Sequence, residues 1–594
     1  MASYEAFFIL ILMYQSIHYD YQTYSYYLRD DKTGWSQFTF QPTYWKRVDE
    51  YQEGAQPVLT GGWAIPTKKL DKTDPNILEK DIDKSLMALR ELYYKFDDVV
   101  PSWHNIIYLD IEIEMGGALT PEYIKSAPMP ITSIALRDMT TKQYICFILD
   151  KSQEIQETNQ DDKLIIPCSS EKELIKKFLD KWEELDPTIV IGWNSAYFDI
   201  PYLYHRFKQI VNNDVLRLSP IRKINLREFA GALQIVIGGI NHLDYMLLHK
   251  KYIMKEEPSY KLGDVGLRYV DLGKVQYEGN LNTLFKNDIN KFIDYNLRDV
   301  EIIEKLEEKL KFIELTIMIS HICNIPYESV YWNTVMNEGA ILKYLKREGI
   351  ISPNKPTTHN PILKNNIESY AGGYILEPVP GLYFDVIDLD FTSLYPSIIK
   401  SLNLGIETLI GRIKVEDNPT YEQNHSLEKL KQRDPNEVIT VEKLNKTNYT
   451  LKAAKIKLGD LIKLIEQNEY TVAASGAMFR TDKKSVVATI LEGWFNKREH
   501  YRALKKKAGK AEDWANYKLY DLYQHSFKIL QNAMYGTYAK NGWRYTDGHL
   551  ICSAAITNSG QRLTMSTIDF VNDKINNEYL QLNKEELIKR FNLT

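Results

Sequence analysis

The run "IIYLDIEIE" at residues 106–114 constrains the fold of this chain more strongly than any other segment. It has the apolar character of a buried strand, yet it carries acids at Asp110 and Glu112. Because side chains alternate between the two faces of a strand, these two acids leave the same face. Strands and helices alternate from this run to about residue 310, which predicts an α/β domain around an acidic site.

Two further segments add acids to this site. Asp199 lies in "VIGWNSAYFDIPYL" (190–203), where a buried strand gives way to a helix. Asp299 lies in "YNLRDVEI" (295–302), four residues after Tyr295 and on the same face of a helix. Four carboxylates brought together cannot all stay ionised without cations. Two Mg²⁺ or Mn²⁺ ions about 4 Å apart would neutralise them and support in-line cleavage of a phosphodiester.

Taken singly, each of these patterns is common as surface polarity or chance spacing. As an ordered set they resemble the three exonuclease motifs of the DnaQ-like, RNase H-like 3′→5′ proofreading domain of family B DNA polymerases. The resemblance implies that Tyr295 orients the attacking water and that Asn194 contacts the terminal nucleotide. "EPSYKLGDVGLRYV" (257–270) is similar to the phage replicative branch of that family. The implied metal ligands are Asp110, Glu112, Asp199 and Asp299.

The resemblance continues at "DFTSLYPSII" (390–399), which is similar to polymerase motif A. Alone, this stretch and the apolar residues before it predict a buried strand that ends in a Tyr-Pro turn. The resemblance implies that Asp390 binds metal and that the backbone carbonyl of Phe391 is a second ligand. Asp388 lies on the same strand face and is interpreted as a structural hydrogen-bonding residue. A two-metal polymerase site needs a second acid from another strand.

The turn after motif A would meet the incoming nucleotide. The N–H groups of Ser393 and Leu394 lie at a helix start, where they suit a triphosphate. By the resemblance, Tyr395 packs under the sugar and excludes a 2′-hydroxyl. The element "YAGG" (370–373) fits the Y-x-G-G link between exonuclease and polymerase modules. The residues that this link implies for contact with single-stranded template are Tyr370, Gly372 and Gly373.

Two helices joined by a polar turn near "AGKAED" are predicted over residues 485–540. In "KILQNAMYGTYA", Lys528, Asn532 and Tyr535 recur at i, i+4 and i+7 on one helix face. The segment resembles motif B. Lys528 would then pair with the incoming phosphates, and Gly536 would let the backbone come close. Asn532 and Tyr535 would line the nascent base pair.

The partner helix, "ILEGWFNKREHYRALKKKAGK", has seven Lys or Arg residues and one Glu between residues 496 and 510. A charge run of this kind is usually a solvated helix face. Arg498, Arg502 and Lys505 share one face, and opposite Lys528 they predict a fingers domain that closes on a dNTP. Arg498 and Arg502 are the expected phosphate ligands, because a guanidinium can donate two parallel hydrogen bonds to phosphate oxygens.

The second polymerase acid of this family comes from motif C, Tyr-x-Asp-Thr-Asp-Ser, and no Asp-Thr-Asp occurs in this sequence. Residues 548–580 resemble the helix that precedes motif C, and the thumb is not found after them. Three explanations for the missing motif C and thumb stay open: a split gene, an inserted element and a fragment. We expect a C-terminal polypeptide with motif C and a thumb as a partner. The resemblance implies a sliding clamp as a further partner.

The resemblance covers nearly the whole chain and implies a multidomain α/β and α+β protein, with an exonuclease followed by an incomplete right-hand polymerase. The expected domains are an N-terminal domain of residues 1–100 completed by 312–365, an exonuclease domain of 101–311, palm segments of 366–484 and 542–594, and a fingers hairpin of 485–541.

Composition limits how the protein can bind nucleic acid and which cellular compartment suits it. The net charge of −5 excludes a global attraction to DNA, so any nucleic-acid site must be a local basic track. The four cysteines are far apart and form no Cys-x-x-Cys pair, which favours a reducing, cytoplasmic compartment over disulfides or structural zinc. The apolar run at 7–13 is too short for a membrane span of about 20 residues, so no membrane association is expected.

Three functions fit these patterns. The first is template-directed DNA synthesis with 3′→5′ proofreading, acting on primer–template, single-stranded DNA and dNTPs with two Mg²⁺ or Mn²⁺ ions per active site. The second is a stand-alone 3′→5′ exonuclease with a vestigial polymerase half, and the third is a non-enzymatic replication scaffold. The intact nucleotide-pocket residues favour the first function over the second, and the four exonuclease acids oppose the third.

Overall fold

The computed structural model describes residues 13–30, 34–96, 103–229, 232–253, 255–356, 372–382, 386, 388–414, 425–540 and 542–591. The chain forms two compact units, the first from residues 1–42 and 83–336 and the second from 43–82 and 337–594. The expected mixture of α/β and α+β architecture is present. None of the helices described here is long and apolar enough to cross a membrane.

A mixed seven-stranded sheet forms the centre of the first unit. Its strand order is β11-β12-β10-β9-β8-β13-β16, with β8 antiparallel to β9 and parallel to β13. The acid-bearing run predicted as a strand is β8, so this expectation is confirmed. The strands are β8 (Ile106–Ile113), β9 (Ile131–Asp138), β10 (Gln143–Leu149), β11 (Thr158–Gln160), β12 (Lys163–Cys168), β13 (Ile189–Gly192) and β16 (Asn241–Asp244).

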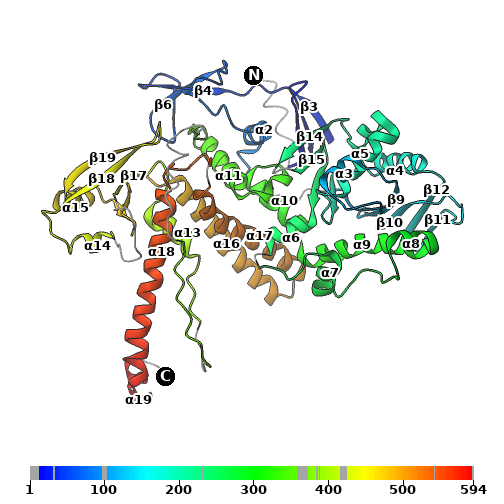
Figure 1. Ribbon diagram of the computed structural model, residues 1–594. Helices are drawn as coiled ribbons and strands as arrows, with labels where there is room; N and C mark the ends of the chain where they lie inside the picture. The colour runs from blue at the N-terminus through cyan, green and yellow to red at the C-terminus, as the bar shows by residue number, and fades with distance from the viewer. Residues whose placement is uncertain are drawn as a thin grey trace. The chain divides into compact units, whose positions relative to one another are not determined.

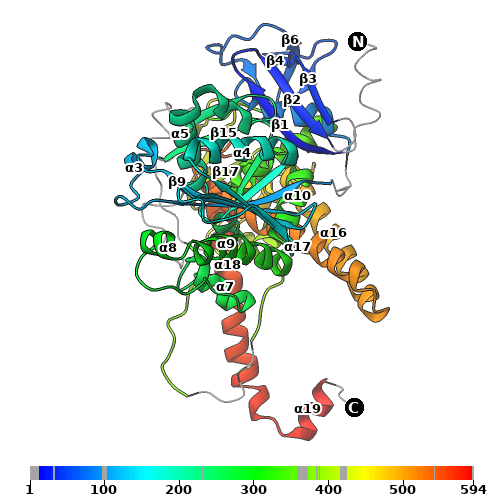
Figure 2. The same ribbon diagram turned by 90° about the vertical axis from the view of Figure 1, so that its right-hand side faces the viewer.

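Helices cover both faces of this sheet. In Figures 1 and 2, α4 (Glu171–Leu185) and α5 (Asp199–Val211) lie on one face, and α9 (Ile289–Leu310) lies on the other. Ser170 caps the start of α4, since its hydroxyl accepts the N–H of Glu173, and the helix buries apolar residues at helical spacing against the sheet. The sheet, α4 and α5 share one continuous hydrophobic core.

The rest of the first unit surrounds this sandwich. The helix α9 ends at Leu310, because Lys311 is in the left-handed conformation (φ 59°) and separates α9 from α10 (Phe312–Cys323). The other elements are β1 (Tyr14–Asp20), β2 (Ser25–Asp30), β3 (Gly34–Phe38), β14 (Ile224–Phe229), β15 (Ala232–Ile237), α2 (Lys84–Tyr93), α3 (Pro121–Ser126), α6 (Tyr245–Tyr252), α7 (Leu262–Val270), α8 (Leu281–Asn287) and α10 (Phe312–Cys323).

The second unit contains two antiparallel sheets. One has the order β19-β18-β17-β21-β20 and packs on α15 (Leu458–Gln467), and the other has the order β5-β6-β4-β7. The strands are β4 (Tyr44–Val48), β5 (Gln56–Pro57), β6 (Trp63–Thr67), β7 (Ile77–Leu78), β17 (Leu409–Ile413), β18 (Val438–Asn445), β19 (Thr450–Lys457), β20 (Thr471–Val472) and β21 (Ala477–Phe479).

The predicted helical hairpin is confirmed as α16 (Val486–Lys510) and α17 (Trp514–Tyr538), joined by a three-residue turn. Tyr501 of α16 stacks on Tyr523 of α17, with ring centroids 4.5 Å apart and an interplanar angle of 10°. The predicted C-terminal helix is confirmed as α18 (Ile551–Phe570). The remaining helices are α11 (Asn333–Arg347), α13 (Leu394–Leu402), α14 (Leu427–Leu430) and α19 (Lys584–Phe591).

The prediction of a buried strand leading into motif A is wrong. Residues 388–391 form no strand and are exposed, with Leu389 62% and Phe391 39% accessible. A strand needs a neighbour to satisfy its N–H and C=O groups, and no described strand lies beside this segment. The segment 372–382 is likewise drawn as extended chain in Figure 1.

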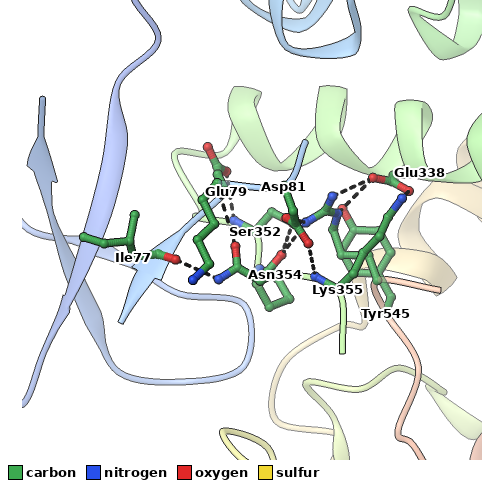
Figure 3. A network of polar contacts seen from close by, with 11 residues as sticks. Ile77, Glu79, Asp81, Glu338, Ser352, Asn354, Lys355 and Tyr545 are labelled. Atoms are coloured by element: carbon green, nitrogen blue, oxygen red, sulfur yellow. Dashed lines mark hydrogen bonds and ion pairs between the residues drawn. The ribbon is translucent and has the colours of Figure 1, made fainter. Parts of the chain in front are cut away.

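A buried ion-pair network explains why residues 43–82 belong to the second unit (Figure 3). The fully buried guanidinium of Arg544 donates to Glu338 Oε1 from Nε and Nη2, at 2.9 and 2.8 Å. Its Nη1 donates to Asp81 Oδ1 at 2.5 Å. Nearby, Asn354 Nδ2 donates to the carbonyl of Ile77 in β7 at 2.7 Å. The expected N-terminal domain of residues 1–100 is therefore divided between the two units.

Replacing Arg544 with Ala should lower the urea midpoint of unfolding by an amount equivalent to about 3–5 kcal/mol, because it removes the buried partner of Glu338 and leaves that carboxylate with only the partly exposed Lys355. The matched control is Lys431→Ala, which breaks the exposed pair with Glu466 and should cost less than about 1 kcal/mol. Equal midpoints for the two variants would contradict a structural role for the network.

Candidate metal centre and nucleotide sites

Two elements, β8 and α9, bring three acids together. Asp110 and Glu112 come from that strand, and Asp299 comes from α9, which packs on it. One carboxylate oxygen from each of the three lies within 4.8 Å of the others. This is the only group of three or more potential His, Cys, Asp or Glu ligands among the residues that the structure describes. The i, i+2 spacing on the strand places two of these groups together, as the sequence predicts.

The fourth predicted acid, Asp199, lies beside this group but is held differently. It is the first residue of α5, and its Oδ1 accepts the backbone N–H of Ile111 at 3.1 Å. Burial raises the pKa of Asp199 to about 7, although this hydrogen bond opposes the shift. A hydrogen bond to the strand between Asp110 and Glu112 fixes the carboxyl next to the other acids.

The raised pKa values of the acids indicate that the group carries an excess of negative charge. Burial, followed by the carboxylates of Asp299 and Asp199, raises the pKa of Asp110 well above its usual range. Burial, followed by Asp299, raises the pKa of Glu112 to about 8. Burial also raises the pKa of Asp299. Oxygen ligands with such pKa values fit hard divalent cations, which would stabilise the ionised forms.

Sequence analysis missed Lys274, which lies in the irregular segment between α7 and α8. Its ammonium contacts Asp299 Oδ2 at 2.5 Å and donates to the hydroxyl of Tyr295 at 3.1 Å. Burial alone would lower the pKa of Lys274, but the carboxylates of Asp299 and Asp110 outweigh it and raise the pKa. Lys274 therefore supplies one positive charge to the acidic group and links it to the predicted water-orienting tyrosine.

Asn296 was also missed. Its Nδ2 donates to Asp110 Oδ2 at 2.7 Å, and its Oδ1 accepts the hydroxyl of Ser133 at 2.5 Å. Asn296 is fully buried, so this amide fixes the orientation of the Asp110 carboxylate. The available signal was its place on α9, three residues before Asp299 and on the same face.

An open cavity of about 850 Å³ lies beside the acids. Trp193 and Asn194 line one side of it, and Asn194 has a positive φ of 61° with its N–H donated to Asp244 Oδ1. Apolar side chains line another side, including Met246 and Leu267. The cavity also touches Asp110, Ser259, Tyr260, Lys261, Leu262, Gly263, Asp264, Lys274, Gln276 and Asp299.

Metal removal should make the stability of the chain depend on pH. Because the pKa of Glu112 is raised in the folded chain, the folded state holds a proton that the unfolded state has released between about pH 4 and about pH 8. Stability in EDTA should therefore fall as pH rises through this range, and Mg²⁺ should restore it. Thermal midpoints measured at each pH check this.

The control for this titration is a matched pair of variants. Glu112→Gln should flatten the decline in EDTA, whereas Glu114→Gln, two residues further along the chain, should not. A pH profile that is the same for wild type and Glu112→Gln would contradict the assignment.

In the second unit, the residues expected to hold the nucleotide partly converge. The rings of Tyr395 and Tyr535 lie 4.4 Å apart at an angle of 39°. A Cβ at Gly373 would lie 3.5 Å from the hydroxyl of Tyr395, and the carbonyl of Gly372 accepts a hydrogen bond from Gln561. The third residue of that link, Tyr370, lies outside the described residues.

Cations gather on the facing sides of α16 and α17. Burial and then the charge of Arg502 lower the pKa of Arg498, whose Nε has no hydrogen-bond partner among the described residues. Burial and then Lys528 lower the pKa of His525, with Arg498 adding to the effect. Lys528 and Asn532 are exposed on α17. These groups form a local positive field that suits an anion.

The motif A residues are not assembled into a metal group. Asp388 and Asp390 are exposed, and neither belongs to a group of three potential ligands within the described ranges. Ser393 has a φ of 54° and precedes α13, which begins at Leu394. A Cβ at Gly536 would meet no described atom within 4 Å, so the close approach expected there stays a prediction.

Comparison with known proteins gives two family matches. A family model described as DNA polymerase family B matches residues 330–592, and one described as DNA polymerase family B, exonuclease domain matches residues 82–265. The chain is 34% identical over 260 residues to the DNA-directed DNA polymerase of Escherichia phage RB69, which covers 43% of this chain and 28% of that protein.

Two further relatives are similar at comparable or lower identity. The DNA-directed DNA polymerase of Enterobacteria phage T4 is 30% identical over 274 residues, 45% of this chain and 30% of that protein. DNA polymerase 1 of Sulfolobus acidocaldarius is 26% identical over 393 residues, 60% of this chain and 42% of that protein. The chain thus spans less than half the length of each of these relatives.

Proposed function

The chain belongs to DNA polymerase family B, and from this premise we propose that its first unit is a 3′→5′ exonuclease that hydrolyses DNA with two divalent metal ions. The observation that carries the proposal is the convergence of Asp110, Glu112 and Asp299 beside a cavity large enough for a nucleotide. Sites for small ligands typically measure about 300–1,000 Å³.

The residues present fit two Mg²⁺ or Mn²⁺ ions, since both prefer oxygen ligands. Asp110, Glu112, Asp199 and Asp299 would hold them, and the bound ions would lower the pKa of water and stabilise charge on the phosphate. The hydroxyl of Tyr295 would orient the attacking water. The ammonium of Lys274 would stay charged and face the scissile phosphate from the cavity wall.

The cavity lining supports DNA as the substrate. Asn194 would contact the terminal nucleotide, and the apolar side chains of Met246 and Leu267 would contact its base. The test is incubation of the chain with 5′-labelled single-stranded DNA. We expect stepwise shortening from the 3′ end with Mg²⁺ or Mn²⁺ and none in EDTA. Intact DNA in the presence of either metal would contradict the proposal.

We propose that the second unit supplies palm and fingers for DNA synthesis on primer–template. The contact between Tyr395 and Tyr535 supports a nucleotide pocket in which Tyr395 lies under the sugar and Asn532 and Tyr535 meet the base pair. The cation group supports triphosphate binding by Arg498, Arg502 and Lys528, with Ser393 and Leu394 donating backbone N–H groups. The resemblance implies two further roles, which we propose here as well. The backbone would come close to the DNA at Gly536, and the single-stranded template would contact Tyr370, Gly372 and Gly373.

Synthesis is proposed to need a partner polypeptide with the Tyr-x-Asp-Thr-Asp-Ser motif and a thumb. Asp390 and the carbonyl of Phe391 would be only part of a metal site, and no described acid completes it. Exposed apolar side chains along the preceding segment support a missing β-pairing partner: Ile375 is 87% and Leu382 82% accessible. A sliding clamp is a further proposed partner.

The proposed domain assignments follow from these roles. They comprise the exonuclease at 101–311, palm segments at 366–484 and 542–594, and the fingers at 485–541, whereas the N-terminal domain expected at 1–100 with 312–365 is divided between the two compact units. The four cysteines are all free and buried, which supports the proposed reducing, cytoplasmic setting. The unassembled Asp390 favours one second candidate, a stand-alone exonuclease, which the synthesis experiment in the Discussion distinguishes.

A further inference from the structure

We propose that the tip of the α16–α17 hairpin binds single-stranded DNA, in a site that extends beyond the nucleotide pocket and shares Arg502 with it. The inference rests on the proposed function, because it places unpaired DNA on the same chain as the exonuclease and the palm. The site is an open cavity of about 480 Å³ lined by Arg502, Lys505, Lys506, Gly509, Lys510, Tyr517 and Gln524.

The cavity is closely packed at its base. A Cβ at Gly509 would lie 3.2 Å from Cδ2 of Tyr517, so the glycine lets α16 pack directly on this ring. The ammonium of Lys505 lies 4.7 Å from the centroid of the same ring and 2.7 Å from Asp521 Oδ1. Lys505 is therefore already neutralised and acts as part of the wall.

Two other lysines supply uncompensated charge. Lys506 and Lys510 are exposed, and neither forms an ion pair with any carboxylate in the described part of the chain. They are four residues apart, so they lie on one face of α16 about 6 Å apart along its axis. This local excess of charge contrasts with the net charge of −5 for the chain and suits successive phosphates of a nucleic-acid backbone.

An aromatic pair beside these cations, exposed at Trp514 and half-buried at Tyr517, favours single-stranded DNA as the partner. Trp514 is 59% accessible, and its ring meets that of Tyr517 edge to face with centroids 5.6 Å apart. Stacking of unpaired bases on aromatic rings beside a basic track is the typical mode of single-strand binding. Duplex DNA offers no free base faces to such a ring, so the pair favours a single strand.

The cavity shares Arg502 with the proposed triphosphate site, but its two uncompensated lysines lie further along α16. Lys506 and Lys510 lie 8 and 12 residues beyond Arg498 on one helix, which is about 12 and about 18 Å along its axis. One triphosphate held by Arg498 and Lys528 would not reach both lysines. We therefore assign the cavity to the phosphate backbone of DNA.

The first experiment measures the anisotropy of a labelled oligothymidylate with the full chain, in EDTA, between about 50 and about 200 mM salt. In Lys506→Gln/Lys510→Gln, loss of two phosphate contacts should reduce the slope of log affinity against log salt by about 1.4 and weaken binding at least about tenfold at the lowest salt. The matched control is Lys172→Gln/Lys176→Gln, an exposed i, i+4 pair on α4, which should bind like wild type.

The second experiment uses Trp514→Ala, which should weaken binding at least about fivefold and leave the salt slope unchanged, because stacking releases no counterions. Binding by all variants equal to that of the control pair overturns this inference alone. Loss of tripolyphosphate binding by the lysine variants, with DNA binding retained, also overturns it and makes the cavity a nucleotide site. A wild-type chain that neither binds nor degrades single-stranded DNA overturns the proposed function itself.

Discussion

The double substitution Asp110→Ala/Glu112→Ala should reduce the release of nucleotides from the 3′ end of single-stranded DNA at least about a thousandfold. Both residues would be lost from the group whose oxygens lie within 4.8 Å of one another, so two ions would no longer have their ligands. The measurement is the rate of shortening of 5′-labelled DNA with saturating Mg²⁺. Full activity in the double variant would exclude this group as the metal site.

The control for this experiment is Glu114→Ala. Glu114 continues the alternation of acids after β8 but is not part of the metal group, so its variant should keep most of the activity. The double variant should also stay folded, because removing clustered like charges relieves repulsion when metal is absent. A thermal midpoint in EDTA well below that of wild type would mean that lost activity reflects unfolding.

The second large effect concerns synthesis. A polypeptide of these 594 residues should not extend a primer alone, and extension should appear when a polypeptide with Tyr-x-Asp-Thr-Asp-Ser and a thumb is added. Asp390 alone cannot place two cations across the attacking and leaving oxygens. The difference should be several orders of magnitude, since electrostatic stabilisation is usually the largest catalytic contribution. Primer extension is measured with the exonuclease blocked by the double substitution.

Substitutions separate the roles of the two motif A acids in the reconstituted reaction. Asp390→Ala should abolish synthesis, whereas Asp388→Ala should slow it without stopping it. Robust extension with no partner present would mean that another acid of this chain, with Asp388 the first suspect, completes the site. Failure to reconstitute with an active exonuclease would favour the stand-alone nuclease.

Part of the candidate metal centre could be predicted from the sequence because the geometry of that part is local. The spacing of Asp110 and Glu112 on a strand fixes a shared face, and both the strand and the start of α5 at Asp199 lie where the pattern predicts. Lys274 could not be found in this way. It lies in an irregular segment, where no periodicity indicates which way a side chain points, and its role depends on the path that the chain takes after α7.

The sequence alone therefore indicated the family, the acids of the candidate metal centre and the helical hairpin. Local spacing predicts the hairpin and the shared face of Asp110 and Glu112, whereas Asp199 and Asp299 follow from the ordered motifs of the resemblance. Only the tertiary structure decided that residues 43–82 join the second unit, that Lys274 neutralises Asp299, and that residues 388–391 stay exposed. The physical reason is the same in each case. A buried charge such as Arg544 must find its counter-charge, and a strand must find its hydrogen-bonding neighbour, wherever the fold places them.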